Sequence, residues 1–481
     1  MEGAGTNGQA PATVQVTITG LGTAGEGVGR VVAGPQEWVG RACFLPGALP
    51  GEEVTGRVQE VHPRYLRADL VDLLRVSPDR VRPPCPVYAQ CGGCQLQHLS
   101  YEAQLAWKRQ LVVDALRHIG RIDNPPVEAC LPAENPSGYR NKVQMPVAAA
   151  ERTVRLGFYR RASHDVVDVD GCLVQPDLTN RLVACLRRWV LELHIQPYDE
   201  HNRRGDLRHI LVRVSRRTGE VLVVLVTRTE QFDAGRALAE RLAQEFPELV
   251  GVIQNIQPSP GNVVLGEQDR LLWGRPYLHE ILRVQVASGQ WVERRFQISA
   301  HSFFQVNSAQ AERLIEVALA ALPPQPQGQA LDLYCGAGAF TLFLAARFAF
   351  VIGMEEVVAA VQDAWRNARL NQVSNVDFWA GRVERILPSS RLTVAAALVD
   401  PPRAGMDREA VKALARLAPP RVVYVSCNPA TLARDLQLLL MGDTGEGGTR
   451  VRYRLEKVQP VDMFPLTAHV EAVAVLVADR G

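Results

Sequence analysis

Beyond residue 329 the chain alternates between short apolar runs and longer segments whose apolar residues recur every three or four positions. The apolar runs are "ALDLY" (330–334), "FVIGME" (350–355), "VDFWAG" (376–381), "AAALVD" (395–400) and "RVVYVS" (421–426). Helical patterns such as "VVAAVQDAWRNARLNQ" (357–372) and "REAVKALARL" (408–417) lie between them, and two more strand-like runs close the chain. This alternation predicts a doubly wound α/β domain over residues 296–481 that ends in a hairpin.

The first part of the chain has a different pattern. Residues 12–75 consist of short alternating runs broken by glycine and proline, which predict a compact β-barrel. Residues 76–135 hold a segment rich in proline and cysteine and an amphipathic helix (100–120), and residues 136–295 predict a mixed α+β domain with a hairpin over "RTGE". Residues 1–11 are predicted to be a disordered tail, so the whole chain is a multidomain α/β protein.

The composition is that of a soluble protein, with 47% hydrophobic and 22% charged residues and a net charge of only +2. No apolar run is as long as a membrane span, and the N-terminus lacks the pattern of a secretion signal. We therefore expect a cytoplasmic protein without a membrane partner, and no protein partner is predicted. Residues 139–217 hold 15 Lys and Arg against 9 Asp and Glu, a local excess of six that favours an anionic partner.

A glycine turn follows the first strand of the doubly wound domain. In "LDLYCGAGAF", Gly336 and Gly338 allow a ligand to approach the backbone at the start of a helix. Glu355 ends the next strand, where a carboxylate can accept hydrogen bonds from both ribose hydroxyls, and Asp400 begins "DPPRAG" at the same sheet edge. Without a Walker lysine or a third glycine, the pattern fits S-adenosylmethionine (SAM) better than ATP or NAD. A structural turn in a domain without a ligand is the alternative.

Cys427 lies between a strand and a helix in "RVVYVSCNPATLARDL" (421–436), where the helix dipole is expected to favour its thiolate. One chemistry that needs such a thiolate is methylation of uracil, because addition of a thiolate to C6 turns C5 into a nucleophile. Glu471 is the candidate base that removes the C5 proton, with His469 as its rival, and Asp400 and Gln305 are candidate hydrogen-bonding groups. An inert buried thiol at 427 and an exposed strand position at 471 are the alternatives.

At these motifs the chain resembles the RNA uracil-5-methyltransferase family, over nearly all of residues 12–481. The resemblance is carried by "FFQVN" (303–307), "LDLYCGAG", "VDPPRAG", "YVSCNPATLARDL" and "PVDMFPLTAHVEAVAVL" (460–476), and it is closest to the bacterial 23S rRNA enzymes. It implies a Rossmann-like SAM methyltransferase domain, with Cys427 as nucleophile and Glu471 as base. It also implies that SAM is bound by Gln305, Tyr334, Glu355 and Asp400. Arg382, Glu356 and Ala468 depart from the family pattern, and Arg382 does so on the side where the adenine of SAM is expected.

Four cysteines are organised as three plus one: Cys85, Cys91, Cys94 and, at a distance, Cys172. Three close thiolates and one distant one suit a cubane iron–sulfur cluster, although zinc and an unligated state remain open from the spacing alone. The resemblance implies a [4Fe–4S] cluster on these residues. Because methyl transfer from SAM needs no electron, we expect the cluster to have a structural role.

The predicted barrel resembles a TRAM module, an oligonucleotide-binding (OB) type of barrel that binds RNA. The segments "YRNKVQMPV" (139–147) and "LGFYRRASHDVV" (156–167) interleave aromatic residues with arginine, which suits stacking on unpaired bases. The expected function is SAM-dependent methylation of uridine C5 in 23S rRNA. The alternatives are a methyltransferase of the tRNA T loop, a non-catalytic RNA-binding protein with the same fold, and a nitrogen-directed methyltransferase.

Overall fold

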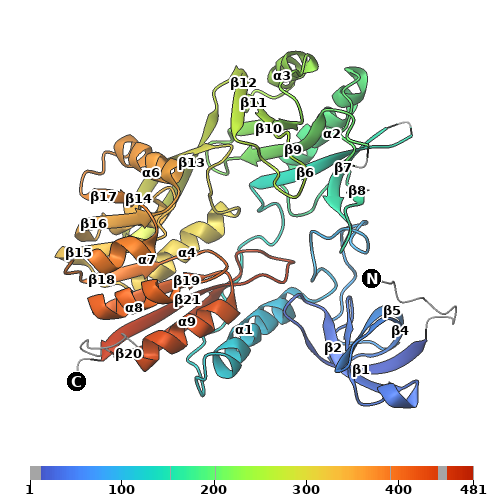
Figure 1. The fold of residues 1–481 in the computed structure, drawn as a ribbon, viewed down its shortest axis with the longest axis horizontal. Helices are drawn as coiled ribbons and strands as arrows, with labels where there is room; N and C mark the ends of the chain where they lie inside the picture. The colour runs from blue at the N-terminus through green and yellow to red at the C-terminus, as the bar shows by residue number, and fades with distance from the viewer. Residues whose placement is uncertain (1–11, 152, 201, 391, 443–451, 480–481) are drawn as a thin grey trace, which may run out of the picture. The chain divides into compact units, whose positions relative to one another are not determined.

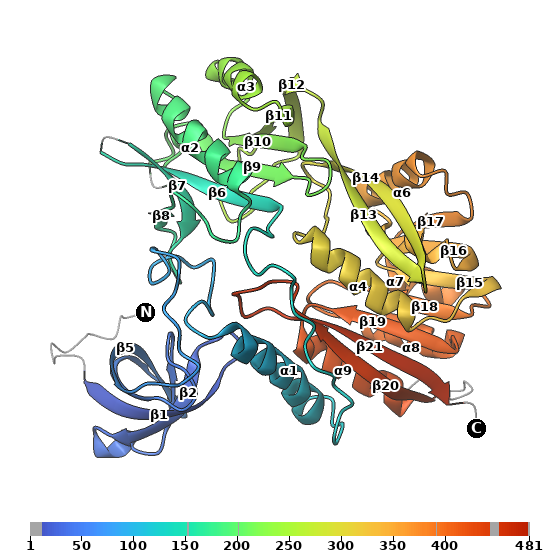
Figure 2. The same ribbon diagram turned by 180° about the vertical axis from the view of Figure 1, so that it is seen from behind.

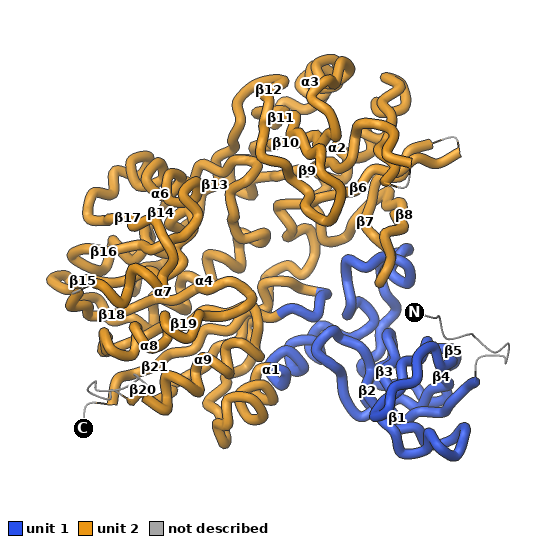
Figure 3. The backbone as a smooth tube through the Cα atoms, viewed as in Figure 1, with its two compact units in different colours: residues 1–111, 466–469 blue, residues 112–465, 470–481 orange. Residues whose placement is uncertain are grey.

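The computed structural model describes residues 12–151, 153–200, 202–390, 392–442 and 452–479 (Figure 1). The tail predicted for residues 1–11 lies outside these ranges. The chain forms two compact units (Figure 3). Unit 1 comprises residues 1–111 and 466–469, and unit 2 comprises residues 112–465 and 470–481.

Unit 1 contains the predicted barrel, closed in the strand order β1-β2-β3-β5-β4. Alternate residues of its strands point inward, so that Val14, Val16 and Ile18 are buried. The buried Glu52 accepts two hydrogen bonds from Arg80, at 2.6 and 2.8 Å, which tie the segment after the barrel to its wall. The elements are β1 (Thr13–Leu21), β2 (Gly27–Ala33), η1 (Gln36–Trp38), β3 (Ala42–Leu45), β4 (Glu53–Val61) and β5 (Tyr65–Arg75). The expected barrel is confirmed.

The predicted amphipathic helix is α1 (Tyr101–His118), which begins in unit 1 and ends in unit 2. A seven-stranded sheet follows in unit 2, in the order β12-β11-β10-β9-β6-β7-β8, with helices α2 (Asp177–Glu192) and α3 (Ala234–Glu245) packed against it. β9 and β10 form the expected hairpin, pairing Val214 with Val221. The strands are β6 (Lys142–Ala149), β7 (Val154–Tyr159), β8 (Val166–Asp168), β9 (Leu207–Val214), β10 (Val221–Thr227), β11 (Leu249–Ile256) and β12 (Gln268–Gly274).

A two-stranded ribbon, β13 (Tyr277–Ala287) and β14 (Gln290–Ser299), leads into helix α4 (Ser308–Ala320), which packs against β13 (Figure 2). Asn307 caps this helix by accepting a hydrogen bond from the Gln310 N–H at 3.3 Å. The start of α4 is therefore fixed directly after the "FFQV" motif.

The C-terminal part of unit 2 is the predicted doubly wound sheet, in the order β17-β16-β15-β18-β19-β21-β20. Five strands are parallel, and the final pair is the expected antiparallel hairpin. The strands are β15 (Gln325–Leu333), β16 (Phe348–Glu355), β17 (Val376–Ala380), β18 (Ala396–Val399), β19 (Arg421–Ser426), β20 (Arg452–Val461) and β21 (Glu471–Asp479). β15 begins inside the proline-rich segment "LPPQPQGQ" (322–329), since Gln325 pairs with Phe348.

The helices of this domain fall into two groups that cover the two faces of the sheet (Figures 1 and 2). One group is α4 with α5 (Ala339–Leu344) and α6 (Val358–Leu370). The other is α7 (Val383–Ile386), η2 (Leu387–Ser389), α8 (Arg408–Leu417) and α9 (Pro429–Met441). Within the described ranges, none of the helices is long and apolar enough to cross a membrane.

Candidate active site at the carboxyl edge of the C-terminal sheet

Four of the candidate residues lie where neighbouring parallel strands end. Leu333 pairs with Met354 on one side and with Val399 on the other, and Val399 pairs with Tyr424. Tyr334, Glu355 and Asp400 therefore line up along one edge of the sheet, and Cys427 follows the end of β19 on the same edge. Ligands of open α/β sheets bind at this edge.

The antiparallel strand β21 brings Glu471 to the same place. Ser426, the last residue of β19, pairs with Ala472, so Cys427 and Glu471 are the next residues of the two strands at this edge. Only 4% of Glu471 is exposed, and its carboxyl group acts electrostatically on the Cys427 thiol. Asp400 acts on both groups. The structure thus brings Cys427, Glu471 and Asp400 together, whereas His469 is exposed and lies before β21 begins.

The glycine turn is shaped by backbone conformations that most residues avoid. Gly336 and Gly338 have φ values of 54° and 84°, and Tyr334 has a φ of 65°, which is uncommon for a residue with a side chain. Glu355 holds the turn, because its carboxylate accepts the Gly336 N–H at 3.1 Å and the Val357 N–H at 2.8 Å. Glu355 is therefore fixed beside the turn at the position that the sequence suggested for a ribose contact.

Gln305 lies in the loop before α4. Asn141 donates a hydrogen bond to the Gln305 carbonyl at 3.0 Å, and Asn307 donates one to the carbonyl of Met463 at 3.1 Å. The loop is thus tied to the segment that leads toward Glu471. Within the described residues, the Gln305 side chain makes no hydrogen bond to the other candidate residues.

The turn after Asp400 is held by a buried carboxylate on α9. Asp435 accepts hydrogen bonds from the Tyr424 hydroxyl at 2.6 Å and from the Met406 N–H at 2.7 Å. Gly405 fits here because its φ is 77° and an added Cβ would lie 2.6 Å from the Asp435 carboxylate. Asn428, the N-cap of α9, donates a hydrogen bond to the Arg403 carbonyl at 3.0 Å. The loops that carry Asp400 and Cys427 are therefore one connected unit.

Burial and negative charge dominate the electrostatics of the site. Burial raises the pKa of Asp400 to about 7 and raises the pKa of Glu471 well above its usual value, and Asp400 raises the latter further. The pKa of Cys427 is also raised, to about 11, first by burial and then by Glu471, while Arg403 lowers it. Burial and the neighbouring acids thus act against the thiolate that we expected from the helix dipole.

Three residues around these candidates were not singled out as site residues from the sequence. Arg403 is a cation that acts on both Cys427 and Glu471. Asp332 is fully buried in β15, and burial raises its pKa to about 7. Phe303, two residues before Gln305, is 72% exposed. A carboxylate inside an apolar strand was the available signal for Asp332, whereas the exposure of Phe303 and the nearness of Arg403 depend on the fold.

Arg382 and Glu356, two of the departures from the family pattern, interact with each other. The Arg382 guanidinium lies 3.7 Å from the Glu356 carboxylate and also pairs with Glu384. All of these residues follow strands β16 and β17 at the edge described above. The two departures thus form a local ion-pair network next to Glu355.

The four organised cysteines offer soft sulfur donors, which suit an iron–sulfur cluster or zinc. Cys85, Cys91 and Cys94 lie in unit 1 and Cys172 in unit 2, and all four are partly buried. The Gly93 N–H donates a hydrogen bond to the Cys91 sulfur at 3.4 Å, a contact that suits a thiolate. Within the described residues, no three His, Cys, Asp or Glu side chains converge as a metal site. The predicted cluster is therefore not shown.

Comparison with known proteins identifies the family. Residues 11–71 match the TRAM domain, and residues 214–387 and 381–479 match the tRNA (uracil-5-)-methyltransferase family, which together cover more than half of the chain. The chain belongs to the RNA uracil-5-methyltransferase family. The expected resemblance is therefore confirmed.

Relatives match over nearly the whole chain. An uncharacterized RNA methyltransferase of Halalkalibacterium halodurans is 41% identical over 466 residues, covering 96% of both chains. One of Listeria monocytogenes is 38% identical over 467 residues, covering 96% of this chain and 97% of its own. The crystal structure of the Pyrococcus abyssi tRNA (uracil-54, C5)-methyltransferase with S-adenosyl-L-homocysteine matches with a TM-score of 0.75 and 29% identity, covering 98% of this chain and all of that one.

The charges around Cys427 predict how readily its thiol reacts. Because only the thiolate reacts with iodoacetamide, alkylation of Cys427 should be slow at neutral pH and rise with pH toward a midpoint near 11. Glu471→Gln removes a negative neighbour and should lower this midpoint, whereas Arg403→Gln removes a positive one and should raise it, each by roughly half to one pH unit. Alkylation is measured on the Cys427 peptide by mass spectrometry.

Lys412→Gln is the matched control, since Lys412 pairs with Glu409 on α8 and does not act on the thiol. Its profile should equal that of the wild type. Equal midpoints in all four proteins would contradict the electrostatic description of the site.

Proposed function

We propose that this protein transfers a methyl group from SAM to C5 of a uridine in RNA, with 23S rRNA as the substrate. The observation that carries the proposal is the pairing of β19 with β21, which sets Cys427 next to Glu471 with Asp400 beside them. A nucleophile and a base at the ligand-binding edge of the sheet are the two groups that C5 methylation requires.

Cys427 and Glu471 would carry out the addition and the proton removal that this reaction needs. The Cys427 sulfur forms a bond to C6 of the uracil, and the electron pair of the C5–C6 double bond moves onto the ring as an enolate. C5 then takes the methyl group, which SAM supplies when bound. Glu471 removes the C5 proton, the double bond re-forms and the C6–sulfur bond breaks. A raised pKa suits Glu471 to this task, because a more basic carboxylate accepts a carbon-bound proton more readily.

Arg403 and Asp400 assist these steps. The Arg403 guanidinium lowers the pKa of Cys427 and so promotes the thiolate that burial disfavours. Asp400, with a pKa of about 7, can donate a hydrogen bond to a uracil carbonyl when protonated or accept one from N3 when ionised. We assign the Gln305 amide a similar hydrogen-bonding role toward the uracil or the SAM molecule.

A basic cluster next to the Gln305 loop supports RNA as the substrate. Lys142 on β6 pairs with Arg213 on β9, and burial followed by Arg213 and Arg140 lowers the pKa of Lys142 to about 8. None of these three cations has an ion pair within the described part of the chain. Arg213 also donates hydrogen bonds to the carbonyls of Ala300 and Ser302, beside the exposed Phe303. Arg213 is itself buried, but the partly buried Lys142 and Arg140 and the exposed Phe303 ring suit phosphates and an unstacked base.

The choice of RNA has two candidates. The TRAM domain and the cluster cysteines favour 23S rRNA, through the resemblance described above. A tRNA is the second candidate, since the Pyrococcus abyssi relative is a tRNA (uracil-54, C5)-methyltransferase. The same residues would carry out the same reaction on either RNA in the cytoplasm, so only the docking of the RNA would differ.

We also propose that Cys85, Cys91, Cys94 and Cys172 hold a [4Fe–4S] cluster with a structural role. Gln95, the residue after Cys94, binds the segment that precedes Glu471. Its N–H donates to the Leu466 carbonyl at 3.1 Å, and its side chain accepts the Ala468 N–H at 3.3 Å. A cluster that fixes the cysteine loop would thereby fix the chain leading into β21. This role needs no electron transfer.

Replacing the base should trap the covalent intermediate. Glu471→Gln keeps the nucleophile but cannot remove the C5 proton, so we expect turnover to fall by about a hundredfold or more and a protein–RNA adduct to accumulate. The adduct is detected as a band of reduced mobility on a denaturing gel, with transcripts of 23S rRNA and of tRNA tested side by side. Glu409→Gln, an exposed carboxylate change on α8, is the control that should turn over normally.

Adduct formation with rRNA but not with tRNA supports the proposed substrate, and the reverse result moves the substrate to tRNA. If Cys427→Ala in the Glu471→Gln background still forms the adduct, the assigned nucleophile is wrong.

The cluster predicts a defined metal content. Protein purified without oxygen should contain about four iron and four sulfide ions per chain, and Cys94→Ser should lose them. Cys185→Ser changes a cysteine on α2 that is not one of the four proposed ligands, and this variant should keep the iron and sulfide. Iron and sulfide are measured chemically together with zinc. Stoichiometric zinc without iron would contradict the cluster, and a need for a reductant during turnover would contradict its structural role.

A further inference from the structure

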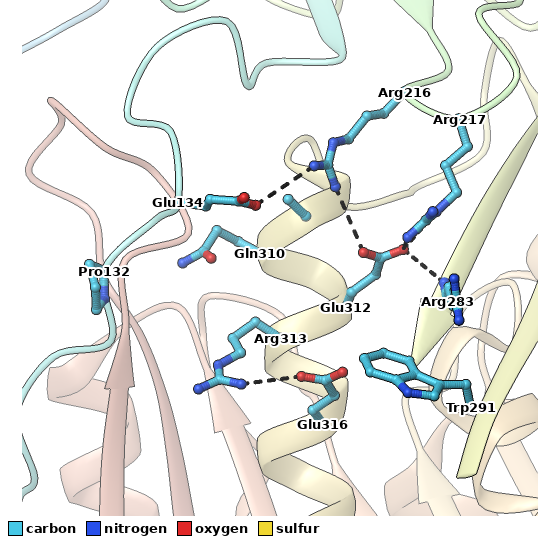
Figure 4. Close-up of a pocket in the computed structure, with 11 residues that line it drawn as sticks. Pro132, Glu134, Arg216, Arg217, Arg283, Trp291, Gln310, Glu312, Arg313 and Glu316 are labelled. Atoms are coloured by element: carbon cyan, nitrogen blue, oxygen red, sulfur yellow. Dashed lines mark hydrogen bonds and ion pairs between the residues drawn. The ribbon is translucent and has the colours of Figure 1, made fainter. Parts of the chain in front are cut away.

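A polar pocket separate from the candidate site residues lies in unit 2, along helix α4 (Figure 4). Its volume is about 550 Å³, within the range of small-molecule and nucleotide sites. Four arginines, three glutamates and one tryptophan are among its lining residues, which gives the pocket a net charge of +1. The lining consists of Pro132, Glu134, Arg216, Arg217, Arg283, Trp291, Ala309, Gln310, Glu312, Arg313 and Glu316.

One carboxylate organises the pocket wall. Glu312 is mostly buried and accepts two hydrogen bonds from Arg217, at 3.0 and 2.7 Å, and one from the Arg283 N–H at 2.7 Å. These contacts join α4 to the "RTGE" turn and to β13. Glu312 and Arg217 are therefore structural, and their charges cancel.

The other arginines are held less firmly. The Arg216 guanidinium lies 3.8 Å from Glu312 and 3.9 Å from Glu134, and Arg313 lies 3.4 Å from Glu316. The side chains of Arg216 and Arg313 are about half exposed. Loose, exposed ion pairs of this kind are worth little in water, so both guanidinium groups can turn to another anion at small cost.

Arg283 and Trp291 form an exposed part of the wall. The Arg283 guanidinium lies 5.1 Å from the centre of the Trp291 ring, and within the described residues it has no ion pair. Trp291 is 50% exposed, and its indole N–H has no hydrogen-bond partner in the same ranges. An exposed indole beside an unpaired guanidinium is the combination on which single-stranded nucleic acids stack.

We propose that this pocket binds a nucleotide of single-stranded RNA that flanks the methylated uridine, an inference that rests on RNA being the substrate. The base stacks on Trp291, and Arg283, Arg216 and Arg313 face the neighbouring phosphates. The target uridine itself must be unstacked to reach Cys427, so the RNA next to it needs a separate hold.

The position of the pocket along α4 supports this assignment. The helix begins three residues after Gln305, and five residues from its first nine line the pocket. At 1.5 Å per residue, the far wall at Glu316 lies only about 12 Å along the helix from Ser308. The α4 residues of the pocket therefore lie within about 12 Å of the start of the helix, a distance that a single RNA strand can span.

The test measures binding of a fluorescein-labelled uridylate dodecamer to the full-length protein by anisotropy, without SAM. Trp291→Ala should weaken binding by about tenfold, and Trp291→Phe should restore it to within about twofold, because a phenyl ring still stacks. Arg283→Gln should lower the slope of log affinity against log salt by about 0.7, the value for one lost phosphate contact, while Trp291→Ala should leave the slope unchanged. Arg236→Gln, an exposed arginine on α3, is the matched control and should behave as the wild type.

The outcomes separate this proposal from the proposed function. Equal dodecamer affinity in Trp291→Ala and the wild type, or no binding by the wild type, overturns the pocket assignment whether or not the protein methylates uridine. If Trp291→Ala weakens binding in a protein that makes no 5-methyluridine, the pocket is still a site for single-stranded RNA, but the proposed function fails and with it the place of the pocket beside a methylated uridine. Thermal unfolding of each variant is recorded as a control. If both Trp291→Ala and Trp291→Phe lose affinity and melt at a lower temperature, the loss is structural and contradicts stacking on Trp291.

Discussion

The antiparallel pairing of β21 with β19 is the constraint on which the site depends. A sheet of parallel strands alone would place Tyr334, Glu355, Asp400 and Cys427 along its carboxyl edge. The reversed strand adds a residue from the end of the chain to that edge, and its register makes this residue Glu471. A slip of one residue would turn Glu471 to the opposite face of the sheet and remove it from Cys427.

This arrangement is costly for stability and useful for chemistry. Asp332, Asp400 and Glu471 are acids whose pKa values are raised by burial. Asp332 and Glu471 lie on strands of the same sheet, and Asp400 directly follows a third strand of it. Burying carboxyl groups without full compensation opposes folding, and such clusters are concentrated at functional sites. The negative surroundings also suit a cationic methyl donor, while Arg403 is the nearby cation that can favour a thiolate at Cys427. Hydrogen bonds elsewhere in the domain stabilise the loops around the site. Among them, the buried Asp435 carboxylate accepts hydrogen bonds from the Tyr424 hydroxyl and the Met406 N–H.

Much of the fold could be predicted from local patterns. The alternation of strands and helices, the barrel, the terminal hairpin and the helix bounds of α8 follow from periodicity, which depends on neighbours in sequence. The start of β15 could not be predicted from periodicity, because Pro324 and Pro326 flank Gln325. Gln325 belongs to the strand only because it pairs with Phe348 of β16. The motifs located Cys427, Glu471 and Asp400, but the raised pKa of Cys427 depends on burial and on Glu471, which lies 44 residues away in sequence. The α4 pocket could not be predicted from the sequence either, because its walls come from separate segments between residues 132 and 316 that only the fold brings together.

The central claim is that Cys427 adds to C6 of uracil and thereby makes C5 nucleophilic. The most direct measurement is tritium release from ribosomal RNA labelled at uracil C5, in the presence of SAM, by the wild type and by Cys427→Ala. The account predicts release by the wild type and none by the variant. Methyl incorporation without tritium release, or release that survives Cys427→Ala, would contradict it.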